Sequence, residues 1–147
     1  KKTVIAKLTP AVTDITVMAK AARDNGADAL TLSNGYPGLA ISAKTRKPVL
    51  GNIQGGICGP SLKPLNMLHV WKASQAVDIP IIALGGIMNA EDAIEYILAG
   101  ATAVSVGTAN LIDPTTTMKV AAGIEQYLEE SEFSDINELV GLAWKQR

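Results

Sequence analysis

Short apolar runs alternate with amphipathic segments along the chain. Four runs, at residues 4–8, 28–33, 79–84 and 103–106, are mostly apolar and too short to bury themselves as helices. Runs that are apolar on both faces are typical of parallel strands covered on two sides. We therefore predict a parallel strand at each of these four places.

Helical patterns follow each predicted strand. Residues 13–25 place Ile15, Met18, Ala19 and Ala22 on one helical face, and Gly26 ends that helix. Further helices are predicted over residues 64–77, 89–98, 113–129 and 135–144. Asn89 and Asp113 are predicted N-caps, with Pro114 at a first helical position and Asp92 placed to complete a reciprocal cap with Asn89.

Repetition of strand, loop and helix predicts the fold class. Four consecutive βα units indicate an α/β fold with right-handed crossovers, either the second half of a (βα)8 TIM barrel or a small doubly wound sheet. We favour the barrel because candidate ligand groups follow every strand: Lys7, Asn34, Gly85-Gly86 and Gly107-Thr108. Four strands alone would leave two edges and an unfilled interior. We therefore expect residues 1–147 to form a single C-terminal half-barrel domain whose first half precedes Lys1.

Residues 34–63 form a long excursion rich in glycine and proline between the second strand and the next helix. We predict no regular structure there. A loop of this length in a compact domain is usually functional.

Two strand ends carry small residues that expose the backbone. Gly85 and Gly86 follow one apolar run, and Gly107 and Thr108 follow the next. Consecutive N–H groups without a neighbouring Cβ can converge on an anion. The pair therefore predicts a phosphate-binding cup.

Composition and charge exclude several classes of function. Hydrophobic residues make up 48 % of the chain. Its 13 basic and 14 acidic residues give a net charge of −1, and no segment is strongly basic. We therefore expect no nucleic-acid partner. No run approaches the roughly twenty apolar residues of a membrane span and no signal peptide opens the chain, so we expect a cytoplasmic protein. Cys58 and His69 are the only residues of their types, which argues against a disulfide and a metal site.

An ordered series of motifs runs through nearly the whole chain. It consists of residues 5–10 with 12–15, then 26–32 and 45–48, Gly55-Gly56, Gly59-Pro60, Lys63-Pro64, Gly85-Gly86-Ile87, 99–101 and 106–110. In order and spacing the series resembles the second half of the class 1 dihydroorotate dehydrogenases, most closely the 1B subfamily. Many phosphate-binding barrels share the glycine pairs, whereas the full series is specific.

The resemblance implies FMN as the phosphorylated ligand of a (βα)8 barrel. It assigns the FMN phosphate to Gly85, Gly86, Gly107 and Thr108, with further cofactor contacts at Ser33 and Gly59. It also implies that Lys7 approaches the flavin ring, where a cation stabilises the negative charge that accumulates when the ring accepts a hydride. The alternative for Lys7 is a solvated lysine at a strand end.

The same resemblance implies oxidation of dihydroorotate to orotate in de novo pyrimidine biosynthesis, with substrate contacts at Asn34 and Gly35. Asn34 matches an asparagine that hydrogen-bonds the pyrimidine, although Asn34-Gly35 also has the composition of a turn. The family usually has an apolar residue before this asparagine and threonine or serine after it. Ser33 and Gly35 depart from that pattern, so the pyrimidine substrate stays open.

No catalytic residue is assigned within the chain. In the family the general base is a cysteine in the first half of the barrel, so we expect the isolated chain to be inactive. Cys58 stands in the cofactor loop, where serine is common, and is expected to be a small buried hydrophobe. His69 is expected to be structural or exposed.

Three functions stay open from the sequence. The 1B resemblance implies a catalytic subunit with an FAD and 2Fe-2S partner and NAD as final acceptor, and we expect a homo-oligomer. A second reading is a dihydropyrimidine dehydrogenase-like FMN barrel that acts on an uncharged pyrimidine. A third is a non-catalytic half-barrel that binds a phosphate or flavin ligand, or that pairs with a second copy of itself.

Overall fold

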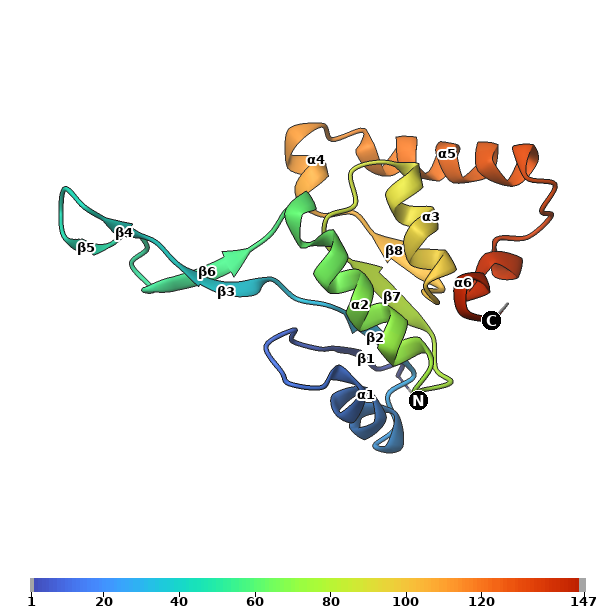
Figure 1. The fold of residues 1–147 in the computed structure, drawn as a ribbon, viewed down its shortest axis with the longest axis horizontal. Coiled ribbons are helices and arrows are strands. Elements are labelled where there is room, and N and C mark those ends of the chain that lie inside the picture. The colour runs from blue at the N-terminus through green and yellow to red at the C-terminus, as the bar shows by residue number, and fades with distance from the viewer. Residues whose placement is uncertain (1, 146–147) are drawn as a thin grey trace.

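The computed structural model describes residues 2–145 and contains a parallel sheet backed by helices (Figure 1). The sheet has the order β1-β2-β7-β8, formed by β1 (Ile5–Lys7), β2 (Ala29–Leu32), β7 (Ile81–Leu84) and β8 (Ala103–Ser105). The main helices are α1 (Ile15–Asp24), α2 (Lys63–Ser74), α3 (Ala90–Leu98) and α5 (Thr116–Glu130). The predicted α/β half of a (βα)8 barrel is confirmed.

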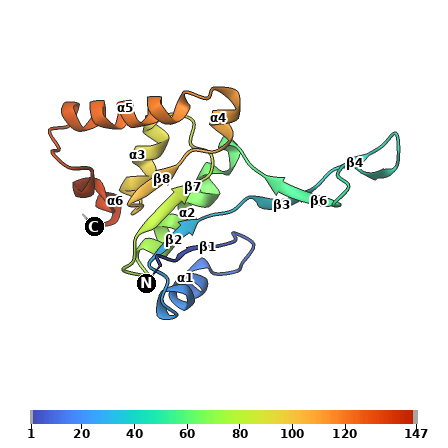
Figure 2. The ribbon, with the colours of Figure 1, turned by 180° about the vertical axis from the view of Figure 1, so that it is seen from behind.

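The sheet is covered on one face only. Leu30, Leu32, Ile81 and Ala83 point toward the helices and are at most 1 % exposed. The opposite face carries exposed side chains at both edges of the sheet: Ile5, Lys7, Ala103 and Ser105. Figure 2 looks onto the strands from this bare side, with α2 behind them. Because parallel strands are normally covered on both faces, the bare face corresponds to the interior of a barrel.

Side-chain caps mark the start of α1 and α3. The side chain of Asn89 accepts a 2.9 Å hydrogen bond from the N–H of Asp92, which confirms Asn89 as the N-cap of α3. Asp113 was expected to cap the next long helix, and that expectation is wrong because α5 begins at Thr116 with Thr115 at the N-cap. The Asp113 carboxylate instead accepts from the N–H of Thr115 and pairs with Lys119 at 2.6 Å.

Two short segments near the carboxyl end differ from the expected helices. A one-turn helix, α4 (Thr108–Ile112), follows β8 directly and was not predicted. The predicted terminal helix is divided into the 3-10 turn η2 (Ile136–Leu139) and α6 (Leu142–Lys145). Gly141 lies between them with a φ of 73°, a left-handed conformation that interrupts a helix.

The long glycine-rich excursion is regular, contrary to expectation. It forms an antiparallel arm that projects from the half-barrel, with β3 (Tyr36–Leu39) paired to β6 (Gln54–Ile57) and β4 (Ile41–Ser42) paired to β5 (Lys47–Pro48) (Figure 1). A 3-10 turn, η1 (Pro60–Leu62), connects the arm to α2. Glycine and proline disfavour central strands, but a two-stranded ribbon has only edge strands, where both are tolerated.

Two glycines allow backbone strain to be separated from packing. Gly26 and Gly100 both have positive φ, 88° and 117°, but a Cβ at Gly26 would meet nothing within 4 Å, whereas one at Gly100 would collide with the side chain of Ser74. Gly26→Ala should lower the free energy of unfolding by about 1 kcal/mol through strain alone. Gly100→Ala should lower it by about 2–4 kcal/mol, because overpacking is added. Urea unfolding measures both, and equal losses would show that Ser74 moves aside freely.

Candidate functional site

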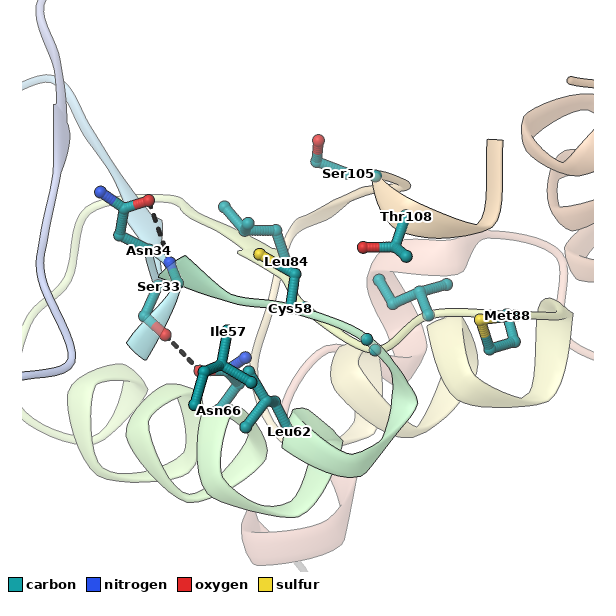
Figure 3. A pocket seen from close by; sticks show the side chains of 16 residues that line it. Ser33, Asn34, Ile57, Cys58, Leu62, Asn66, Leu84, Met88, Ser105 and Thr108 are labelled. Carbon is teal, nitrogen blue, oxygen red and sulfur yellow. Dashed lines mark hydrogen bonds between the residues drawn. The ribbon is translucent and has the colours of Figure 1, made fainter. Parts of the chain in front are cut away.

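A cavity of about 200 Å³ lies where β2, β7 and β8 end (Figure 3). The carboxyl ends of parallel strands meet at one edge, so residues far apart in the sequence converge there. Eight of the nine predicted binding residues line this cavity: Ser33, Asn34, Gly35, Gly59, Gly85, Gly86, Gly107 and Thr108. No described residue that lines it carries a formal charge. An anion in this cavity would therefore be held by backbone and side-chain dipoles.

Lys7 is the predicted residue that does not line this cavity. It is exposed at the end of β1, in register with Thr31 of β2, and lies on the bare face of the sheet. The described residues therefore place Lys7 on the barrel-interior side, apart from the glycine pairs.

Four glycines shape the cavity wall in two different ways. A Cβ at Gly59 or Gly107 would meet nothing within 4 Å, so these residues leave backbone facing open space. A Cβ at Gly85 would collide with the amide of Asn66, and one at Gly86 would lie 2.9 Å from the backbone nitrogen of Lys63. The first two positions keep the wall open, whereas Gly85 and Gly86 let the loop after β7 pack directly on the first turn of α2.

The loop after β2 lies beside the root of the arm. Asn34 is exposed and its Oδ1 accepts a 3.0 Å hydrogen bond from the N–H of Gly35. A Cβ at Gly35 would lie 3.2 Å from the Sγ of Cys58 and from the backbone of β6, so a side chain there would press on the arm. Cys58 is exposed and lines the cavity, so the expectation of a buried cysteine is wrong.

His69 has a structural contact at the root of the arm. Its ring stacks on Tyr36 with centroids 6.3 Å apart, and its Nδ1 is buried without a hydrogen-bond partner among the described residues. Burial and the nearby Lys72 lower the pKa of His69. These contacts agree with the structural role expected for this histidine.

Hydrogen bonds from α3 hold the loop after β7 in place. Tyr96 is fully buried, and its hydroxyl donates to the carbonyl oxygen of Gly85 at 2.7 Å. Burial raises the pKa of Tyr96, so the phenol stays a donor. The N–H of Met88 donates to the carboxylate of Asp92 at 2.8 Å. The segment from Gly85 to Met88 is thus fixed at both ends by α3.

An ion pair connects α2 to α3 beside this loop. The Nζ of Lys63 lies 2.5 Å from Asp92 and 2.8 Å from Glu95. Hydrogen bonds that the ammonium donates to the carboxylates of Asp92 and Glu95 raise the pKa of Lys63. Burial alone would raise the pKa of Asp92, but the hydrogen bonds from Lys63 and from the N–H of Met88 outweigh burial and lower it below the ordinary value of 3.8. Asp92 is therefore a charged link between the two helices and the loop.

Residues 2–145 contain no group of three or more His, Cys, Asp or Glu side chains placed to hold a metal ion. The helices described are all too short or too polar to cross a membrane.

The geometry agrees with comparisons to known proteins. The dihydroorotate dehydrogenase family model matches residues 1–128. The chain belongs to the dihydroorotate dehydrogenase family. It is 52 % identical over 141 residues to the dihydroorotate dehydrogenase B (NAD(+)) catalytic subunit of Pelobacter propionicus, a match covering 96 % of this chain. It is 53 % identical to the subunit of the same name from Geotalea daltonii and 55 % identical to that from Desulforamulus reducens, each match covering 95 % of this chain. The chain spans about half the length of these curated relatives, 46 % in each case.

Sequence reasoning missed two residues at this candidate site. Tyr96 reads as an ordinary apolar position of α3, and no sequence pattern reveals its bond to Gly85. Asn66 carries a detectable signal, because it shares the buried face of α2 with Val70 and Ala73 at a spacing where an apolar residue is expected. A polar residue on such a face indicates either a buried hydrogen bond or a ligand contact.

The lowered pKa of Asp92 predicts how acid affects the stability of this fold. Its stabilising contribution should be complete above the unfolded-state pKa near 3.8 and should be lost as pH falls through the lower folded-state value. Asp92→Asn should therefore be less stable than wild type at pH 7, and the gap should shrink below about pH 4. Urea unfolding from pH 7 to pH 2 measures this. Glu91→Gln, an exposed change in the same turn, controls for net charge, and a gap independent of pH would contradict the assignment.

Proposed function

We propose that this chain is the C-terminal half of the FMN-binding catalytic barrel of a dihydroorotate dehydrogenase, which oxidises dihydroorotate to orotate. The observation that carries the proposal is the cavity at the strand ends, where Asn34 lies together with Gly85-Gly86 and Gly107-Thr108. Family membership supports the reaction.

The residues present suit a phosphorylated flavin. Gly59 and Gly107 leave backbone facing open space, and the Thr108 hydroxyl points into the cavity (Figure 3). Neutral donors of this kind bind phosphate oxygens without a neighbouring cation. Gly85, Gly86, Gly107 and Thr108 would hold the phosphate, with Ser33 and Gly59 beside the cofactor. When bound, FMN supplies the hydride-accepting ring.

The substrate side is assigned to Asn34 and Gly35. Asn34 is exposed at the cavity rim, and its amide can both donate to and accept from a pyrimidine ring. Lys7 would place its ammonium beside the flavin ring from the bare, barrel-interior face. The general base would come from the first half of the barrel, which would also cover that face.

Partners follow from the resemblance and from the relatives. The similar proteins are named catalytic subunits of a NAD(+) enzyme, which supports an electron-transfer subunit with FAD and a 2Fe-2S cluster and NAD as acceptor. We extend the proposal to a homo-oligomeric, cytoplasmic enzyme.

A matched pair of glycines tests the cofactor site. Gly107 and Gly51 both have room for a Cβ, but only Gly107 lines the cavity. In the protein with its complete barrel, Gly107→Val should weaken FMN binding at least about tenfold, equivalent to about 1.4 kcal/mol, because the side chain fills the ligand space. Gly51→Val, in the arm, should leave FMN binding unchanged. Flavin fluorescence titration of the apoprotein measures both.

Orotate formation in the same preparations tests the reaction. Wild type should contain FMN and form orotate from dihydroorotate, and orotate should compete for the site better than uracil. Protein that never binds flavin would overturn the proposal. Flavin-loaded protein that prefers uracil would support the dihydropyrimidine dehydrogenase-like reading instead.

A further inference from the structure

Asn66 has a buried side-chain amide whose nitrogen has no hydrogen-bond partner among the described residues. Its side chain is 2 % exposed, and the hydroxyl of Ser33, itself fully buried, donates to its Oδ1. Within residues 2–145 this is the only hydrogen bond recorded for the Asn66 side chain. Figure 3 shows the amide nitrogen directed away from Ser33, and Asn66 lines the cavity.

The position of the amide nitrogen is defined by the glycine pair. A Cβ at Gly85 would collide with Nδ2 of Asn66, so this nitrogen lies directly against the first glycine of the loop after β7. The amide nitrogen is not among the buried polar atoms that lack both a partner and solvent contact in the described structure. It therefore borders the cavity at the point where the proposed phosphate loop begins.

The Ser33 hydroxyl binds the oxygen end of the Asn66 amide. An asparagine amide has a carbonyl oxygen that accepts and a nitrogen that donates twice. The Ser33 hydroxyl occupies the oxygen, so the donor end remains for a ligand. At the cavity wall the Asn66 N–H has no described protein partner, so an oxygen atom of a ligand in the cavity can accept its hydrogen bond.

We propose that Asn66 donates a hydrogen bond from Nδ2 to an oxygen of the phosphorylated ligand held at Gly85 and Gly86, with Ser33 as its positioning residue. The inference rests on the proposed function for the identity of that ligand, FMN. Because no described residue lining the cavity is charged, each neutral donor there carries a substantial share of the affinity.

Three variants of the complete protein test the assignment, with FMN and riboflavin titrated against the apoprotein by fluorescence. Asn66→Leu removes the donor at similar size and should weaken FMN binding about tenfold. Asn66→Asp keeps an acceptor for Ser33 but replaces the donor by an oxygen, and should weaken FMN binding about 10- to 100-fold. Ser33→Ala leaves the amide free to turn and should weaken binding about threefold.

Ser74→Ala is the matched control. Ser74 lies at the other end of α2 and donates to the carbonyl of Ala99, outside the cavity, so this variant should bind FMN like wild type even where its melting temperature falls. Melting temperatures of all apoproteins separate folding defects from loss of affinity.

The outcomes distinguish the two proposals. If the variants bind FMN more weakly but bind riboflavin with wild-type affinity, the Asn66 bond is to a phosphate oxygen. If they bind both ligands more weakly, the bond is to a hydroxyl of the sugar-alcohol chain. Wild-type affinity in Asn66→Leu and Asn66→Asp, while wild type itself binds FMN, overturns the role of Asn66 alone. A loss confined to orotate binding also overturns it. Wild type that binds no flavin overturns both proposals.

Discussion

The close approach of the first turn of α2 to the loop after β7 is the contact on which the site depends. Gly85 lies against the amide of Asn66, and Gly86 lies against the backbone of Lys63. Both glycines have positive φ, 112° and 78°, so a side chain at either position would meet strain and collision together. The loop can pack here only with a bare backbone, and the same bare backbone is what an anion requires.

The one-sided sheet explains why this loop needs support from the helices. The buried side of the sheet packs on α1, α2 and α3, whereas the opposite side is bare. Nothing on the bare side of the described chain holds the strand ends. On the helix side, Tyr96 of α3 binds the carbonyl of Gly85, and Asp92 of α3 binds the N–H of Met88. Stability and ligand geometry therefore depend on the same helix-side bonds.

The sequence predicts this fold wherever local pattern and tertiary environment agree. The apolar runs became strands, and Asn89 caps α3 because capping is a local interaction. The arm was missed because Pro37, Gly38, Gly55 and Gly56 disfavour strands in general but are tolerated in a two-stranded ribbon. Asp113 was misassigned because α5 begins at Thr116, so the bonds of its carboxylate to the Thr115 N–H and to Lys119 lie just before the helix. In the site, the ends of the apolar runs predicted the glycines, whereas the bond of Tyr96 depends on a tertiary contact that no local pattern encodes. The place of Asn66 on the buried face of α2 indicates a polar partner but does not identify it.

The charges around Gly85 and Gly86 offer an anion in the cavity little net attraction. Lys63 is the cation whose backbone lies against Gly86, yet its ammonium is paired with both Asp92 and Glu95. Two carboxylates beside one ammonium leave little net positive field for the cavity, and the lining itself is uncharged. Lys63 therefore acts on the loop through position and not through charge. From the described residues, affinity for a phosphate in this cavity would come from the directions of N–H, hydroxyl and amide dipoles, so the residues that orient the loop would bear on binding together with those that touch the ligand.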